Sequence, residues 1–145
     1  KGLARTSSTP GRTQSLNFFL VNNRFRFVDL PGFGYAKVPQ QIRTSWGEMV
    51  TGYLAKRSQL VLSIHIVDSR HEPTKQDLQL HEWLEHSNKP QLIVATKSDK
   101  LSNNELRKNL EHIAHVLEND SVVAYSAKSG RGRDELWRAI KSAIS

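Results

Sequence analysis

The chain has 145 residues, a length that suits one domain with a sizeable hydrophobic core. It has no cysteine, which excludes disulfides and thiolate metal sites, and no apolar run approaches the roughly 20 residues of a membrane span. The net charge of +7 and the pI of about 9.9 favour contact with a polyanion such as RNA only slightly over an ordinary solvated surface.

The first part of the chain predicts a loop, a hairpin and a helix. Residues 1–15 are rich in Ser, Thr, Gly, Pro and Arg, which is typical of a polar loop. Aromatic and β-branched residues in 16–21 and 25–29 flank a tight turn at Asn22-Asn23-Arg24 and predict a β-hairpin. A Gly-rich stretch follows, and Pro39 suits the first turn of a helix that runs to about Arg57.

From residue 59 onward, predicted strands alternate with predicted helices. The strands are 59–68, 91–96 and 121–126, and the first two read as buried on both faces. The helices run from Thr74 to about His86, from a capping box at Ser102 and Glu105 to about Glu118, and over 132–144. This alternation predicts a parallel sheet, and ligands of such sheets bind beyond the carboxyl ends of the strands.

The first motif, Asp29-Leu30-Pro31-Gly32, follows the second hairpin strand. A carboxylate at this position can hold a water molecule bound to Mg²⁺. The missing side chain of Gly32 lets its backbone N–H approach a γ-phosphate. Taken alone, an Asp-x-x-Gly pattern is more often an ordinary turn.

Two further motifs follow the last two strands. In Thr96-Lys97-Ser98-Asp99, the carboxylate of Asp99 can accept two hydrogen bonds from the N1–H and amino group of guanine, a pair that adenine does not offer. The stem of Lys97 can cover one face of the base. In the segment 126–128, Ser-Ala-Lys, backbone N–H groups can reach the guanine oxygen. The alternative interpretation is a polar loop and a small-residue turn of any α/β protein.

With these motifs in the required order, the chain resembles the EngB family of GTPases, also called YihA or YsxC, of the TrmE-Era-EngA-EngB-septin class of P-loop GTPases. The likeness spans essentially the whole chain. It is carried by the runs STPGRTQ at 8–14, DLPGFGYA at 29–36, VDSRHEPTKQD at 67–77 and TKSDK at 96–100.

The resemblance implies a Ras-like α/β fold with a mostly parallel central sheet, one antiparallel edge hairpin and flanking helices. It also implies GTP or GDP and Mg²⁺ as ligands, and hydrolysis of GTP as a switch in assembly of the large ribosomal subunit, needed for normal cell division. The expected partners are the guanine nucleotide and the ribosomal RNA of a large-subunit precursor. We expect a cytoplasmic monomer that does not bind a membrane.

The resemblance also implies the site residues. Thr13 would bind Mg²⁺ directly and Asp29 would bind it through water. The nucleotide would contact Gly11, Arg12, Thr13, Gln14, Asp29, Leu30, Pro31, Gly32, Thr96, Lys97, Ser98, Asp99, Tyr125, Ser126 and Ala127.

No catalytic side chain is assigned. Many small GTPases orient the attacking water with a Gln after Asp-x-x-Gly, but this chain has Phe33, which cannot hydrogen bond. We therefore expect slow intrinsic hydrolysis, with the water oriented by backbone groups, a partner or K⁺. Basic residues near the same segments are candidates for docking ribosomal RNA: Arg5, Arg12, Lys37, Arg43, Lys56 and Arg57.

The chain departs from the family pattern at one point. No Gly-x-x-x-x-Gly-Lys-Ser/Thr occurs in residues 1–145. The family places this loop after a strand that lies between the second hairpin strand and 59–68. We therefore expect 1–145 to be a single G domain that is incomplete at its N-terminus and inactive as an isolated segment. The alternative is a non-catalytic module that binds RNA or protein and retains the fold without this loop.

Overall fold

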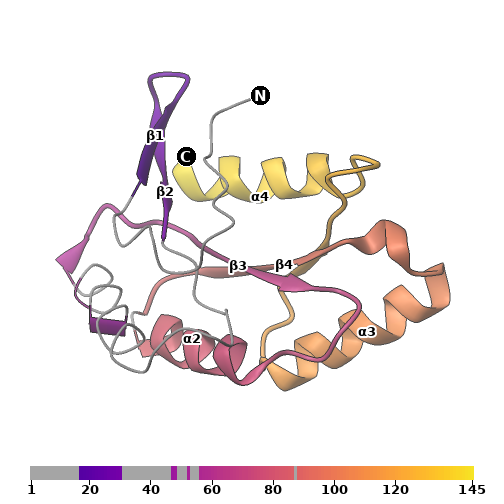
Figure 1. Cartoon of the computed structure of the whole chain (residues 1–145). Coiled ribbons are helices and arrows are strands. Elements are labelled where there is room, and N and C mark those ends of the chain that lie inside the picture. The colour runs from indigo at the N-terminus through magenta and orange to yellow at the C-terminus, as the bar shows by residue number, and fades with distance from the viewer. Residues whose placement is uncertain (1–16, 31–46, 49–51, 53–55, 87) are drawn as a thin grey trace. The chain divides into compact units, whose positions relative to one another are not determined.

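The computed structural model describes residues 17–30, 47–48, 52, 56–86 and 88–145 (Figure 1). The chain divides into two compact units, Lys1–Lys56 and Arg57–Ser145. Among the described residues, no helix combines the length and apolar character that crossing a bilayer requires.

The first unit contains the predicted hairpin. Strands β1 (Asn17–Val21) and β2 (Phe25–Asp29) pair antiparallel, with Val21 opposite Phe25. Asn22 and Asn23 have φ angles of 50° and 54°, a region that Asn tolerates better than most residues. Hairpin and turn are thus confirmed. Of the helix predicted to Arg57, the described residues 47, 48, 52 and 56 are helical, whereas Pro39 lies outside the described residues.

The second unit contains a parallel sheet of three strands in the order β3-β4-β5, as the alternating pattern predicted. The strands are β3 (Ser63–Asp68), β4 (Gln91–Thr96) and β5 (Val122–Ala124). Strand β3 begins at Ser63 rather than at residue 59. The preceding residues form a turn instead, in which the Leu60 N–H donates to the Arg57 carbonyl at 3.3 Å.

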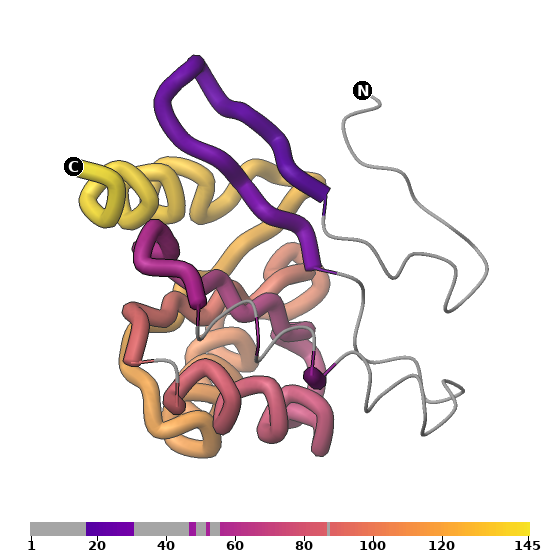
Figure 2. The backbone as a smooth tube through the Cα atoms, turned by 90° about the vertical axis from the view of Figure 1, so that its left-hand side faces the viewer, coloured from indigo at the N-terminus to yellow at the C-terminus, as the bar shows by residue number. Residues whose placement is uncertain are grey.

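Helices cover both faces of this sheet. Figures 1 and 2 show α4 (Arg133–Ile144) on one face, with α2 (Lys75–His86) and α3 (Asn103–Val116) on the other. The predicted starts of α2 and α3 are confirmed by their caps. Thr74 Oγ1 accepts from the Asp77 N–H at 3.1 Å, and Ser102 forms the reciprocal capping box with Glu105.

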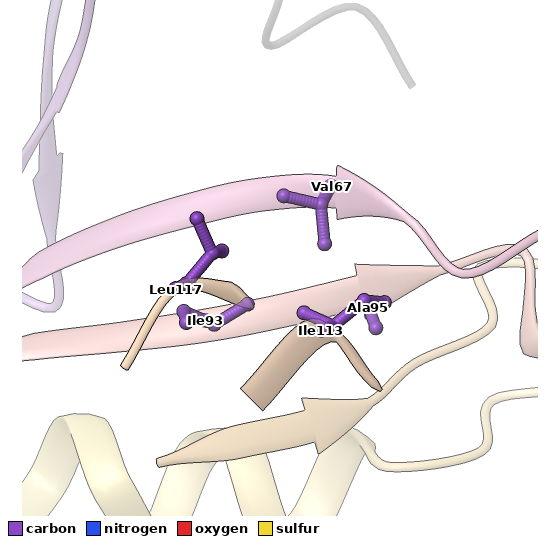
Figure 3. Close-up of a cluster of buried hydrophobic side chains, with 5 residues drawn as sticks. All are labelled: Val67, Ile93, Ala95, Ile113 and Leu117. Carbon is purple, nitrogen blue, oxygen red and sulfur yellow. The ribbon is translucent and has the colours of Figure 1, made fainter. Parts of the chain in front are cut away.

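Strand β4 forms the centre of the core, because its side chains alternate between the two faces. Ile93 and Ala95 pack with residues of β3 and α3 in one buried cluster, shown in Figure 3: Val67, Ile93, Ala95, Ile113 and Leu117. Leu92 and Val94 pack with Val123 and with Leu136 and Ala139 of α4. Burial of β4 on both faces is thus confirmed.

The same expectation is wrong for β3. Val67 is 5% exposed, but its neighbour Ile66 is 65% exposed. Ser63, His65 and Val67 are buried on the face that α2 and α3 cover, and His65 Nε2 lies 3.4 Å from Asp77 Oδ1 of α2. On the other face Ile64 packs in the cluster with α4, whereas Ile66 belongs to neither cluster. A continuous apolar run in the sequence therefore does not predict which of its side chains are buried by other elements.

Gly132, the residue before α4, has no room for a side chain. Its φ is +78°, and a Cβ at this position would overlap the carbonyl oxygen of Ala124 in β5. Gly130 shares the left-handed conformation, with φ of +82°, but a Cβ there would meet nothing within 4 Å.

We expect Gly132→Ala to lower the free energy of unfolding by about 2–4 kcal/mol, because overlap adds to the strain of positive φ. Gly130→Ala is the matched control and should cost about 1 kcal/mol, since only the backbone strain applies. Denaturant unfolding of the full-length gene product measures both. Equal losses for the two variants would contradict the close approach to Ala124.

Candidate functional site

The candidate site lies where the three parallel strands end. Strands β3, β4 and β5 end at Asp68, Thr96 and Ala124, so the loops that follow them lie at one edge of the sheet. The Ser69 N–H donates to the Thr96 carbonyl at 3.0 Å, and the Ser98 N–H donates to the Tyr125 carbonyl at 3.1 Å. Backbone hydrogen bonds therefore join the end of β4 to the loop after β3, and the loop after β4 to the loop after β5.

The loop after β4 turns sharply, so that some of its side chains are buried and others are exposed. Lys97 has φ of 60° and ψ of 29°, a left-handed conformation that starts the short 3₁₀ turn η1 (Ser98–Lys100). Ser98, the first residue of this turn, is fully buried, whereas Lys97 and Asp99 are exposed. The turn thus places one cationic and one anionic side chain where a ligand can reach them.

The Asp99 carboxylate is held by the loop that follows β5. Ser126 Oγ donates to Asp99 Oδ1 at 2.8 Å and also accepts from the Ser129 N–H at 3.0 Å. Ser126 is fully buried, and its N–H donates to the Arg131 carbonyl at 3.0 Å. The Ser126 hydrogen bond lowers the pKa of Asp99, with smaller contributions from nearby lysines that oppose the effect of burial. Asp99 is therefore an exposed, ionised and oriented acceptor at neutral pH.

Seven of the residues expected to contact a nucleotide gather at this edge: Thr96, Lys97, Ser98, Asp99, Tyr125, Ser126 and Ala127. Their surroundings differ. Thr96 Oγ1 donates to the Val67 carbonyl at 2.9 Å, so this hydroxyl ties β4 to β3. Ser98 and Ser126 are buried, and they contact the site through the Ser98 N–H and the Ser126 hydroxyl. Lys97, Asp99 and Ala127 are exposed.

The remaining expected residues belong to the first unit. Asp29 is the exposed last residue of β2, and Leu30 follows it. Gly11, Arg12, Thr13, Gln14, Pro31, Gly32 and Phe33 lie outside the described residues.

The chemistry of Asp29 fits a nucleotide-associated magnesium ion. Such an ion is bound by one or two protein ligands together with phosphate oxygens and water, so it needs no cluster of acidic side chains. Among the residues that the structure describes, no group of three or more His, Asp and Glu side chains could hold a metal ion. The exposed carboxylate of Asp29 can hydrogen bond to a water ligand of Mg²⁺, the role the resemblance implied.

Two residues at this edge are absent from the set expected from the sequence. Arg70 Nε and Nη2 donate to Asp68 Oδ1 and Oδ2 at 3.0 and 2.9 Å, and Lys97 Nζ donates to Asp68 Oδ2 at 3.0 Å. The Arg70 hydrogen bonds, followed by Lys97, hold the pKa of Asp68 well below its ordinary value against the opposing effect of burial. The signal available in the sequence is that Asp68 is the last residue of the predicted strand 59–68.

We expect Ser126→Ala to raise the pKa of Asp99 toward its ordinary value, because the neutral hydroxyl that stabilises the carboxylate is lost. NMR titration of the Asp99 carboxyl carbon measures this change. Ser121→Ala is the control, since Ser121 is exposed and precedes β5 at the opposite end of the strand. An unchanged Asp99 titration in Ser126→Ala would contradict this assignment.

Comparison with known proteins places the chain in a family. Residues 1–97 match the family model described as 50S ribosome-binding GTPase. The chain is 49% identical over 148 residues to a probable GTP-binding protein EngB of Desulforamulus reducens, an alignment that covers 99% of this chain and 72% of that protein. It is 44% identical to a protein of the same name from a Geobacillus species, covering 97% of this chain and 75% of the relative.

Solved structures agree on the fold. A crystal structure of a probable GTP-binding protein EngB superposes with a TM-score of 0.80 at 18% identity, covering 95% of this chain and 86% of that one. Era in complex with MgGDPNP and nucleotides of 16S ribosomal RNA superposes with a TM-score of 0.67 at 19% identity, covering 97% and 48%. The expected P-loop GTPase fold is therefore confirmed, and the chain belongs to the EngB family of GTP-binding proteins, within the 50S ribosome-binding GTPases.

Proposed function

We propose that this chain is the G domain of a protein that binds GTP with Mg²⁺ and hydrolyses it to GDP and phosphate, as a switch in assembly of the large ribosomal subunit. The observation that carries the proposal is the Asp99 carboxylate, exposed at the sheet edge and held by Ser126 at 2.8 Å. Membership of the EngB family supports the same function. A role in cell division, a cytoplasmic location and a monomeric state belong to the proposal through the family resemblance.

The base would be recognised by the loops after β4 and β5. Asp99 would accept hydrogen bonds from the guanine N1–H and amino group, and the Ala127 N–H would donate to the guanine oxygen. The Lys97 stem would cover one face of the base. Tyr125 and Ser126 would shape the pocket, with the Ser98 N–H donating to the Tyr125 carbonyl.

The phosphates would be contacted by the first unit. The γ-phosphate would be approached by the motif at Asp29, Leu30, Pro31 and Gly32. Thr13 would bind Mg²⁺, and its neighbours Gly11, Arg12 and Gln14 would contact the nucleotide. When bound, Mg²⁺ neutralises phosphate charge. The solved complex of Era with MgGDPNP supports this pairing of ion and nucleotide for a relative with the same fold.

Hydrolysis would proceed without an assigned catalytic side chain. Phe33 has no group that could orient water, so intrinsic turnover should be slow. Backbone groups, a partner or K⁺ would orient the water in its place. Stimulation by a partner would suit a switch, because hydrolysis would then occur only after the partner is reached.

The base specificity tests the nucleotide part of the proposal. The full-length gene product should bind GTP and reject ATP. Asp99→Asn should lower the affinity for GTP at least about 100-fold, because two hydrogen bonds to a charged acceptor are lost. Xanthosine triphosphate should bind this variant well, since xanthine has a carbonyl where guanine has the amino group. Asp120→Asn is the control, because Asp120 is exposed before β5.

Equilibrium binding of the three nucleotides and phosphate release measure these effects. A wild-type protein that binds GTP and ATP alike would contradict the proposed role of Asp99. GTP binding without turnover, even with large ribosomal subunits present, would favour the alternative of a non-catalytic binding module.

Docking to ribosomal RNA is the second part of the proposal. The net charge of +7 and the basic residues within 5–57 support it. Affinity for large ribosomal subunits should fall steeply as salt rises, and Lys56→Gln should reduce the slope of log affinity against log salt by about 1. Lys108→Gln in α3 is the control. A subunit affinity that does not change with salt would rule this docking out.

A further inference from the structure

We propose that Asp68 is a positioning residue for base recognition: it holds the Lys97 side chain from the end of β3, while Ser126 holds Asp99 from the loop after β5. Neither the sequence motifs nor the family description assigns Asp68 a role. The inference rests on the proposed function, because it concerns how the same loop would bind a guanine nucleotide.

Parallel register brings Asp68 to Lys97. Asp68 lies opposite Thr96 in the β3–β4 ladder, so the residue after Thr96 emerges beside the Asp68 side chain. Lys97 Nζ donates to Asp68 Oδ2 at 3.0 Å, although the two residues are 29 positions apart in the chain. The contact directs the ammonium group toward β3, with the Lys97 side chain still 54% exposed and open to a ligand.

Arg70 fixes the carboxylate that receives Lys97. Its Nε and Nη2 donate to both Asp68 oxygens at 3.0 and 2.9 Å, and its backbone N–H donates to Asp68 Oδ1 at 3.0 Å. Such a planar, two-point contact restrains the rotation of a carboxylate. Asp68 is therefore an oriented acceptor before Lys97 reaches it.

The loop after β4 is thus held symmetrically by its two neighbours. On the β3 side, Asp68 contacts the Lys97 ammonium and the Ser69 N–H contacts the Thr96 carbonyl. On the β5 side, Ser126 contacts the Asp99 carboxylate and the Tyr125 carbonyl accepts from the Ser98 N–H. Lys97 and Asp99, the two side chains with a proposed contact to the base, therefore each have one side-chain partner: Asp68 at the end of β3 for Lys97, and Ser126 in the loop after β5 for Asp99.

This arrangement lowers the entropic cost of covering the base. A free lysine side chain samples many rotamers, and ordering it opposes binding. With the ammonium bound to Asp68, the stem is ordered before a nucleotide arrives. An exposed ion pair contributes little to folding stability, so the loss of Asp68 should appear in nucleotide affinity rather than in unfolding.

The test is a double-mutant cycle in the full-length gene product. Asp68→Asn should weaken GTP and GDP equally by about three- to fivefold at low ionic strength, the range of an exposed ion pair, and by less at high salt. Asp120→Asn is the matched control and should change neither affinity. In the Lys97→Met background, Asp68→Asn should weaken GTP and GDP binding by less than about twofold, because the side chain that Asp68 positions is already absent.

The outcomes separate the two proposals. A wild-type protein that does not bind GTP overturns the proposed function and this inference with it. Wild-type binding with Asp68→Asn indistinguishable from Asp120→Asn overturns the positioning role alone. An equal loss in the wild-type and Lys97→Met backgrounds also overturns it, because Asp68 would then act without Lys97. A large drop in thermal stability of Asp68→Asn would indicate a merely structural role.

Discussion

The position of β4 between two parallel neighbours is the constraint on which the site depends. Parallel pairing aligns Asp68 with Thr96 and Ala95 with Ala124, so all three strands deliver their following loops to one edge. The same strand forms the centre of the core, with Ile93 and Leu92 facing opposite helical layers. A shift of register would therefore disturb core packing and the loop after β4 together.

At this edge of the sheet, buried residues hold the site in place, and exposed residues are the ones that a ligand can reach. Ser126 is fully buried, and three hydrogen bonds through its hydroxyl and N–H offset the cost of removing a polar residue from water. Asp99 and Lys97 remain exposed, with their orientations set by buried or strand-anchored groups. Gly132 belongs to the same support, because its backbone passes against the Ala124 carbonyl where no side chain fits.

The chemistry of the edge suits selective recognition of a planar, polar ligand. Asp99 is ionised at neutral pH, its pKa lowered further by the Ser126 hydrogen bond, and the nearby Lys97 stem offers an apolar surface with a cationic end. The two charged side chains have separate partners: Lys97 donates to Asp68 at the end of β3, and Asp99 accepts from Ser126 in the loop after β5.

Local signals in the sequence determined much of the structure. The bounds of β4, the turn at Asn22-Asn23 and the caps at Thr74 and Ser102 were predictable, because strand propensity, turn conformation and capping act over a few residues. The motif at 96–99 is the basis of the roles proposed for Lys97 and Asp99, and the structure places both as exposed residues just after β4. Only the tertiary structure decided that Ile66 is exposed and that Asp68 receives Arg70 and Lys97. Burial and a contact across 29 residues depend on which elements pack together and in which register, and no short stretch of sequence contains that information.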